Sequence, residues 1–350
     1  MKLEFPFLWL TQQAKASPKP WKYFDIEGVM LNAYDILKKP MISERIKKQK
    51  VHNYLKFDGV VAIDSGGFLF MKHNEVPISP EKLVEVYEEW KPNFAVSLDH
   101  PIFPSLPENI IRKRQRNSLE NLKTMVEIKR GDNPVLIPVI HGYNKESLEW
   151  YIRELEKIGE FDIYGIGSLV PLAKGIKGGK GGLYKAIDVI MFIKKLIPDR
   201  KLHVFGVGSS LTMHIMFLSG ADSIDSSSWR SKAAFGAIQL PGIGDRYITG
   251  KTSEKYPDLS PNEVDIVKRC QCPACREHGL EGLRTKFTLR AIHNAWVYQK
   301  EIYKIRAHIK EGTYEEYVRS IIKGHKVYKK IFEYILKQRS QLEIIHYLNY

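Results

Sequence analysis

The three cysteines of this 350-residue chain all lie in the stretch CQCPAC, residues 270–275. Cys270, Cys272 and Cys275 are spaced as Cys-x-Cys-x₂-Cys, and three thiolates at this spacing supply all but one of the ligands of a tetrahedral zinc ion. So few cysteines, clustered in one place, make no disulfide framework. The spacing therefore predicts a metal site.

Two histidines compete for the fourth position. His278 follows at Cys-x₂-His spacing, and His293 lies further on, in a predicted helix. A ligand from a separate helix would tie that helix to the cysteine loop, whereas His278 would close only a small local ring, so we prefer His293. Four protein ligands leave no open position for water, and this indicates a structural zinc ion.

A second group of chemically capable residues follows predicted strands. Asp64 in AIDSGGF, Asp99 in SLDHP and Asp225 in SIDSSSW each stand where a short apolar run ends. A buried carboxylate costs free energy unless it has a partner or a task. One such aspartate is most simply a helix N-cap. Three that converge on one place favour a chemical role for the set.

The elements that must position these residues alternate in type. Short β-branched runs are separated by stretches with apolar residues at helical spacing, and this pattern predicts parallel strands with helical crossovers. An open doubly wound sheet is the alternative, but the glycine-rich dinucleotide fingerprint is only partly matched, which is weak support. Strand-end polar residues, including His141 and Ser168, would form one ring in a barrel. We therefore predict an α/β fold, a (β/α)₈ barrel. Strands are predicted at 60–67, 94–100, 135–142, 163–168, 203–209 and 223–228, with a candidate at 28–34.

The alternation stops near residue 240, and three regions follow from the pattern. We predict a catalytic barrel over 1–265, a zinc-binding subdomain over 266–300 that closes on the barrel, and a C-terminal helical segment over 301–350.

The chain is strongly basic, with a formal net charge of +14 and a sequence pI near 9.4. This excess favours a polyanionic partner, since cationic side chains neutralise phosphates and release counterions. The basic residues gather at 112–116, 174–185 and 326–330. No apolar run is long enough to cross a bilayer, so we expect no membrane partner. The lack of a disulfide framework in the cysteine pattern indicates a cytoplasmic location.

Several motifs together resemble those of the tRNA-guanine transglycosylases. NAYDILKKP (32–40), VHNYLKFDGVVAIDSGGF (51–68), FGVGS (205–209), GADSIDSSSWR (220–230), the cysteine cluster and LRAIHN (289–294) occur in the order that this family shows. The resemblance covers about residues 28–300. It implies a (β/α)₈ barrel with a zinc-binding insertion, and a pentosyltransferase that replaces guanine in a nucleic acid by a 7-deazaguanine.

The resemblance also implies roles for individual residues. Asp225 would be the nucleophile that bonds to the ribose, and Asp64 the general acid and base. Asp99 would accept hydrogen bonds from the guanine edge. The remaining expected substrate contacts are Ser65, Gly66, Gly67, Phe68, His141, Gly142, Gly167 and Ser168, and the expected nucleic-acid contacts are Lys177, Lys180 and Arg230.

The chain departs from the family pattern at a few points. Leu69 stands where the family usually has glutamine after DSGGF, and His141-Gly142 stands in place of Gln-Gly. The spacing from Cys275 to His293 is shorter than expected, and no C-terminal RNA-binding module is evident. The leading hypothesis is base exchange on tRNA, with the same chemistry on DNA as its rival. A catalytically silent RNA-binding subunit is a third alternative, and the family also suggests a homodimer.

Overall fold

The structure is a computed structural model, which describes residues 3–71, 73, 75–173, 182–250 and 257–348. The described chain falls into two compact units. The barrel unit comprises Phe7–Val207 and Ala221–Ser227, and the C-terminal unit comprises the described residues among 1–6, 208–220 and 228–350.

Parallel strands form the centre of the barrel unit. Their order in the sheet is β5-β4-β3-β2-β1-β9-β8-β7-β6, and neighbouring strands run parallel throughout. The strands are β1 (Phe7–Thr11), β2 (Gly28–Asn32), β3 (Val60–Asp64), β4 (Phe94–Val96), β5 (Val135–Ile137), β6 (Val139–Ile140), β7 (Ile163–Ile166), β8 (Lys201–Val204) and β9 (Ser223–Ser226).

The two edge strands of this order are one stretch of chain. Only Pro138 separates β5 from β6, and a proline has no N–H to donate to a strand ladder. β5 pairs with β4 and β6 pairs with β7, so the stretch 135–140 joins both ends of the sheet. Counted in this way, eight strands close into a ring, and the predicted (β/α)₈ barrel is confirmed.

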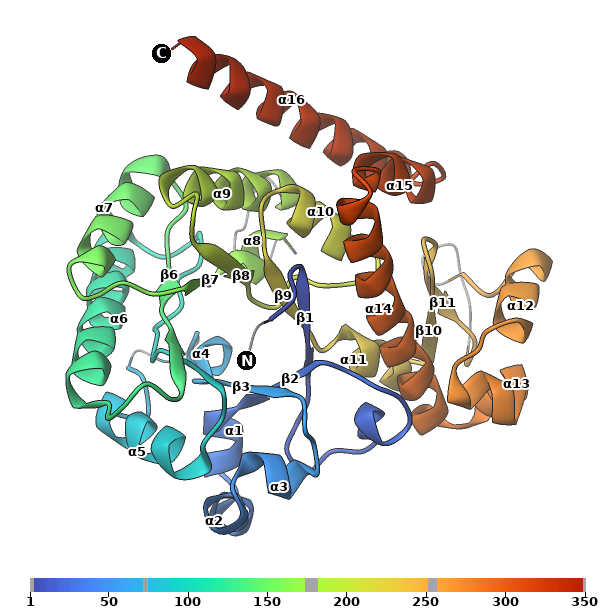
Figure 1. The fold of residues 1–350 in the computed structure, drawn as a ribbon, viewed down its shortest axis with the longest axis horizontal. Coiled ribbons are helices and arrows are strands. Elements are labelled where there is room, and N and C mark those ends of the chain that lie inside the picture. Colours follow the sequence, from blue (N-terminus) through green and yellow to red (C-terminus); the bar gives the residue numbers. More distant parts are fainter. Residues whose placement is uncertain (1–2, 72, 74, 174–181, 251–256, 349–350) are drawn as a thin grey trace. The chain divides into compact units, whose positions relative to one another are not determined.

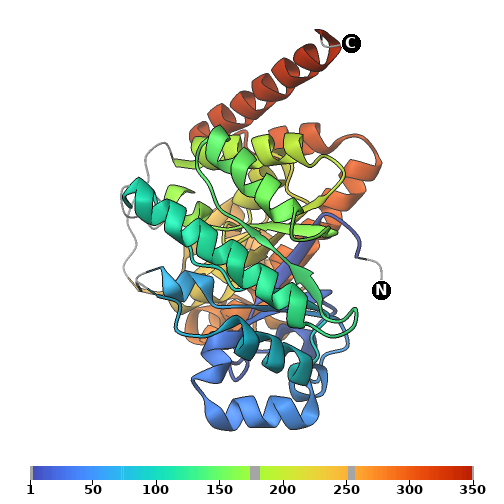
Figure 2. The same ribbon diagram turned by 90° about the vertical axis from the view of Figure 1, so that its left-hand side faces the viewer.

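Helices surround the strands of the barrel unit, and Figure 1 shows α5, α6, α7 and α9 outside the ring. Seen from the side in Figure 2, α6 and α7 lie in front of the strands. Local sequence sets where several of them begin: Ser79 caps α5, with Pro80 in its first turn, and Asn144 caps α7. The helices are α1 (Ala33–Leu37), α2 (Pro40–Gln49), α3 (Val51–Leu55), α4 (Gly67–Phe70), α5 (Pro80–Trp90), α6 (Glu108–Ile128), α7 (Lys145–Glu156), α8 (Leu169–Ala173) and α9 (Gly182–Leu196), with a 3₁₀ turn, η1 (Pro20–Lys22).

β1 is not predicted from the sequence. Its residues, FLWLT, follow Pro6 and carry only one β-branched side chain, so the local strand signal is weak. In the structure β1 lies between β2 and β9, and its first four residues are buried. Burial on both faces is typical of parallel strands. β1 therefore completes the ring that the other predicted strands left open.

The C-terminal unit combines helices with a short antiparallel hairpin. The hairpin pairs β10 (Ala237–Leu240) with β11 (Gly244–Tyr247). Its helices are α10 (Thr212–Leu218), α11 (Ser228–Ala234), α12 (Pro261–Lys268), α13 (Pro273–Thr285), α14 (Phe287–Lys310), α15 (Tyr314–Ile321) and α16 (Lys326–Leu348). Among the described residues, no helix has both the length and the apolar character needed to span a bilayer. The predicted boundaries at 265 and 300 stay a prediction.

Candidate active site and metal centre

A pocket of about 330 Å³ opens at the carboxyl ends of the barrel strands. Every strand position of the ring contributes to it, as expected for the functional face of a (β/α)₈ barrel. Its walls are formed by Thr11, Met30, Leu31, Asn32, Asp64, Gly67, Phe68, Met71, Asp99, Pro101, Val139, Gly167, Ser168, Val170, Pro171, Phe205, Gly206, Asp225 and Ser227. The structure thus brings the three predicted aspartates together around one cavity.

Asp225 stands on β9 and is held by neighbours from two other strands. The hydroxyl of Thr11 donates to Oδ2 at 2.9 Å, and the Gly206 N–H donates to Oδ1 at 2.6 Å. Nε2 of His203 lies 3.5 Å from Oδ1. With 8% of its surface exposed, Asp225 is accessible only from the pocket. These contacts fix its carboxylate in one orientation.

Asp64 is the last residue of β3, and its carboxylate has different neighbours. Asn32 Nδ2 and the Gly66 N–H each donate to Oδ2 at 3.1 Å. The same Asn32 side chain accepts from Asp35 N and so caps α1. Burial, and then the charges of Asp99 and Asp225, raise the pKa of Asp64 to about 8. Asp64 is therefore protonated at neutral pH and can supply a proton inside the pocket.

Asp99 follows β4 and is buried, with two polar contacts. Ser65 Oγ donates to Oδ1 at 3.1 Å, and Nε2 of His141 lies 3.0 Å from Oδ2. A Cβ atom at Gly67 would meet Oδ1 of Asp99 at 2.4 Å, closer than any side chain permits. Gly67, which has no Cβ, therefore lets the main chain pass directly over the Asp99 carboxylate.

His141 lies behind the pocket wall. Its side chain is fully buried and is not among the residues that line the cavity. Nδ1 is 2.9 Å from Ser168 Oγ, and Ser168 in turn accepts from Ile102 N at 3.0 Å. A Cβ at Gly167 would lie 2.6 Å from the His141 ring. His141 therefore packs beneath the loop that forms one side of the pocket.

The other predicted substrate contacts fall in two groups. Phe68 lines the pocket with 59% of its surface exposed, so its ring is free to cover a ligand. Ser65, Gly66 and Gly142 lie outside the lining residues; Ser65 and Gly66 contact Asp99 and Asp64 instead.

The predicted nucleic-acid contacts remain open. Lys177 and Lys180 lie outside the described residues. Arg230 stands on α11 in the C-terminal unit, where its guanidinium group lies 5.1 Å from the centre of the Phe287 ring.

Part of the pocket is not predicted from the sequence. Thr11 and Asn32 end β1 and β2, and Phe205 and Gly206 follow β8. Their signal was the same strand-end position that identified the aspartates. Thr11 does not stand out as a strand end because β1 itself is not predicted. Asn32 does not stand out because its role as the cap of the following helix already explains it.

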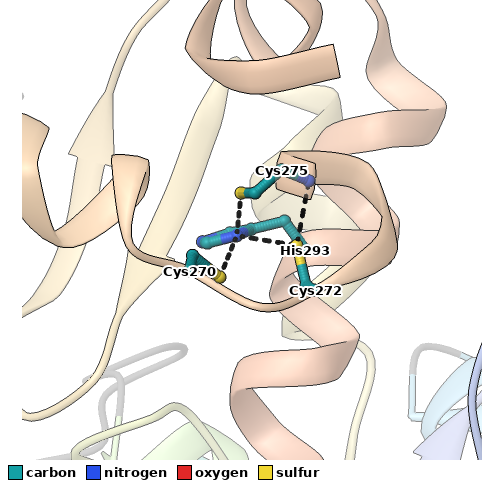
Figure 3. Close-up of side chains that lie close together, drawn as sticks. All are labelled: Cys270, Cys272, Cys275 and His293. Carbon is teal, nitrogen blue, oxygen red and sulfur yellow. Dashed lines mark hydrogen bonds between the residues drawn. The ribbon is translucent and has the colours of Figure 1, made fainter. Parts of the chain in front are cut away.

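The cysteine cluster forms within the C-terminal unit. Figure 3 shows the three sulfur atoms grouped around the ring of His293. Their distances to Nδ1 are 3.7 Å for Cys270, 3.5 Å for Cys272 and 3.3 Å for Cys275. All four candidate ligand atoms lie within 4.8 Å of one another. Three thiols and one imidazole in this arrangement fit a tetrahedral metal ion.

The elements of the C-terminal unit hold these donors in place. Cys272 caps α13 by accepting from Cys275 N at 3.2 Å. His293 belongs to α14, and its Nε2 lies 3.0 Å from the Gln239 carbonyl on β10. Such a contact directs Nδ1 toward the thiols. His278 is exposed and its nearest charged partner is Glu277, so the structure brings His293, and not His278, to the cluster.

The fold and the two sites define a (β/α)₈-barrel protein with a pocket lined by aspartates and a Cys₃His cluster that can hold a metal ion. The model of the family described as queuine tRNA-ribosyltransferase matches residues 4–327. The chain therefore belongs to the queuine tRNA-ribosyltransferase family. The predicted resemblance is confirmed, and the family is one of pentosyltransferases.

Individual relatives agree with this assignment. The chain is 29% identical over 335 residues to the tRNA-guanine(15) transglycosylase of Thermococcus kodakarensis, covering 92% of this chain and 53% of that protein. It is 26% identical over 333 residues to the protein of the same name from Pyrococcus furiosus, covering 92% and 53%. It is also similar to that of Methanopyrus kandleri, with 26% identity over 319 residues, 88% of this chain and 64% of the relative. The chain thus spans little more than half the length of the first two relatives.

Proposed function

We propose that this chain exchanges a guanine base in tRNA for a 7-deazaguanine, through a covalent bond between Asp225 and the ribose. The family and the names of the relatives support a reaction on tRNA guanine. The geometry of the pocket supports the chemistry. Replacement of a base without breaking the backbone needs a nucleophile for the sugar and an acid for the departing base, as in retaining glycosidases.

One observation carries the proposal. Two carboxyl groups share the pocket, but their surroundings differ: Asp64 has a pKa raised to about 8, whereas Asp225 is oriented by Thr11 and Gly206. Titratable groups in contrasting environments within one site are typical of an acid and its partner base or nucleophile. This contrast supports the acid role that we propose for Asp64 and the nucleophile role that we propose for Asp225.

The two half-reactions balance. In the first, a carboxylate oxygen of Asp225 forms a bond to C1′ of the ribose as the bond from C1′ to N9 of guanine breaks. Asp64 gives its proton to the departing base. In the second, the incoming base attacks C1′, its proton passes to Asp64, and the bond to Asp225 breaks. The sugar keeps its original configuration, and Asp64 regains the proton that it lent.

The pocket is suited to a single base. Its volume of about 330 Å³ lies at the low end of ligand pockets, which span about 300–1,000 Å³. Asp99 would accept hydrogen bonds from the N–H edge of the base, and the main chain at Gly67 and Gly167 would approach its face. Phe68 would cover the open side. The target nucleotide must then be turned out of its stack, as in other enzymes that act on a base.

The Cys₃His cluster would hold a structural zinc ion. Zinc is the metal that three thiolates and one imidazole favour, and four protein ligands leave it no open position for catalysis. The ion would tie α13 to α14 and to the hairpin through His293 and Gln239. Cys270, Cys272, Cys275 and His293 would therefore stabilise the C-terminal unit.

The partner would be a nucleic acid. A net charge of +14 favours phosphate contacts, and Lys177, Lys180 and Arg230 are the candidates that we propose for them. Duplex DNA is the alternative substrate, because phosphate contacts alone do not distinguish it from RNA. A silent subunit would not need Asp64 and Asp225 in one pocket.

A parallel labelling assay tests the proposal. The protein is incubated with radiolabelled guanine and either bulk tRNA or duplex DNA, and the labelled polymer is counted. We expect label in tRNA. Label in DNA alone would show that the same base exchange acts on DNA and not on tRNA. No label in either polymer, with a folded protein, would contradict the proposed function.

A further inference from the structure

Two buried histidines stand behind two of the pocket aspartates in matching arrangements. Nε2 of His141 lies 3.0 Å from Asp99 Oδ2, and Nε2 of His203 lies 3.5 Å from Asp225 Oδ1. The other ring nitrogen faces a serine hydroxyl in both cases, Nδ1 of His141 at 2.9 Å from Ser168 Oγ and Nδ1 of His203 at 2.9 Å from Ser223 Oγ.

Neither histidine lines the pocket in this structure. Both side chains are 0% exposed, and neither is among the lining residues, whereas Asp99 and Asp225 are. Within the described residues, neither Nε2 atom has an aligned hydrogen bond in this structure. A buried ring nitrogen beside a carboxylate is costly unless it donates to that group. Contacts of this kind commonly tighten only when a substrate binds.

We propose that His141 and His203 are positioning residues, which act on the reaction through Asp99 and Asp225 respectively. This inference rests on the proposed function. Each imidazole carries its proton on Nε2, directs it at the carboxylate behind the pocket wall, and is held in that orientation by the serine hydroxyl at Nδ1. His141 thereby governs base recognition and His203 governs attack on the sugar.

The division of labour follows from the two carboxylates. Oδ1 of Asp99 also accepts a hydrogen bond from Ser65 Oγ at 3.1 Å. Among the described residues, His141 is the side chain that faces Oδ2, so it is the main restraint on that oxygen. Asp225 is restrained by Thr11 and by Gly206 N–H as well. Loss of His203 should therefore alter the orientation of the Asp225 carboxylate while leaving the recognition of the free base intact.

The chain supplies a matched control. His214, on α10 in the C-terminal unit, is also fully buried, with Nε2 3.1 Å from Glu301 Oε1 and Nδ1 3.1 Å from the Tyr314 hydroxyl. It has the same contacts as the other two histidines, a carboxylate and a hydroxyl, but it is not among the residues that line the pocket. Substitution at His214 measures what the loss of such a buried contact does to stability alone.

Paired variants separate the effect of losing the Nε2 donor from the effect of losing the imidazole ring. Glutamine can place an amide N–H near the position of Nε2, whereas asparagine reaches only to the position of Nδ1. We compare His141→Asn with His141→Gln, and His203→Asn with His203→Gln, beside the same pair at His214. The readouts are the melting temperature, the Kd of free guanine at equilibrium, and the maximal rate at which labelled guanine enters tRNA.

The expected results differ for each histidine. His141→Asn should weaken guanine binding about tenfold, and His203→Asn should slow exchange about tenfold with guanine Kd within about twofold of the wild type. The glutamine variants should recover most of each loss. Both His214 variants should change the melting temperature only. The effect of His141→Asn on guanine binding should also vanish in an Asp99→Asn background, since it acts through that carboxylate.

The outcomes distinguish the two proposals. A wild-type protein that labels no nucleic acid contradicts the proposed function. A wild-type protein that does label tRNA, with His141 and His203 variants that behave like those of His214, overturns the positioning role. If the variants fail to fold, the ¹⁵N spectrum of the wild-type imidazoles decides: a proton on Nδ1 alone, at either His141 or His203, cannot be donated to the aspartate and overturns the inference.

Discussion

Asp64 and Asp225 line the same pocket although β2 and β1 separate their strands in the sheet. Burial, with the charges of Asp99 and then Asp225, raises the pKa of Asp64 to about 8. The barrel therefore does more than bring Asp64 and Asp225 together. By burying Asp64 beside Asp99 and Asp225, it keeps the Asp64 carboxyl group protonated at neutral pH. This unequal pair is the arrangement that a proton donor and a nucleophile require.

The pH dependence of base exchange should report the proton on Asp64. The acid must be protonated, so the rate should fall as pH rises through about 8. The measurement is kcat/KM for labelled guanine between pH 5.5 and 9.5 at constant ionic strength. Asp64→Asn should lower the rate by about 10²–10⁴-fold and remove this falling limb. A wild-type profile that stays flat beyond pH 9 would assign the acid to another group.

The same carboxyl group should make the stability of the protein depend on pH. Its pKa is about 8 in the folded chain and 3.8 in the reference state, so the folded protein holds a proton that the unfolded chain releases. The free energy of unfolding should therefore decrease as pH rises from about 4 through 8. Asp64→Asn abolishes this loss. The melting temperatures of variant and wild type should be closest at pH 4, and the variant should be the more stable at pH 9.

Asp225 should be the only carboxylate that forms the covalent adduct. Asp225→Asn removes the negatively charged nucleophile but preserves the size of the side chain, so binding of nucleic acid should persist while exchange falls on the order of 10⁴-fold or more. Wild-type protein mixed with tRNA should give an adduct that survives denaturation on a gel. Asp64→Asn serves as the control, because it retains the nucleophile. An adduct of undiminished yield from Asp225→Asn would refute the assignment.

Much of the fold was predictable because parallel strands buried on both faces leave a strong apolar signal. The segment 135–142 was predicted as one strand, and Pro138 explains its division into β5 and β6. β1 was missed because FLWLT resembles any short apolar stretch. Only its pairing with β2 and β9, a non-local property, makes it a strand.

The pocket was predictable to the extent that strand ends identify it. The aspartates converge because a barrel brings all carboxyl ends to one face. Side-chain direction was not predictable: His141 follows a strand end as Asp99 does, yet it is fully buried behind the wall. The family resemblance implies that His141 contacts the base. That direct contact stays a prediction, and the buried position of the ring supports an action through Asp99 instead.

Close approach of the main chain at Gly67 should be essential for base binding. In Gly67→Ala the new Cβ would lie 2.4 Å from Asp99 Oδ1, so either the carboxylate or the loop must shift. We expect weaker guanine binding, by about tenfold or more, with a smaller effect on melting temperature. Gly159→Ala is the control in the same unit, since its Cβ would meet only ordinary contacts at 3.6 Å. Equal guanine affinity in both variants would argue against recognition at Asp99.

Metal removal should act on folding before it acts on chemistry. Cys272→Ser removes one thiolate from the cluster, whereas its hydroxyl can still cap α13. We expect a loss of roughly 4 kcal/mol or more in the free energy of unfolding, as for other lost metal sites. His293→Ala should behave alike, and His278→Ala should resemble the wild type because that side chain is exposed and faces Glu277. Thermal unfolding with and without a chelator, alongside zinc content by atomic absorption, measures the effect. Loss of exchange activity in Cys272→Ser at temperatures where the protein remains folded would show that the metal has a role beyond stability.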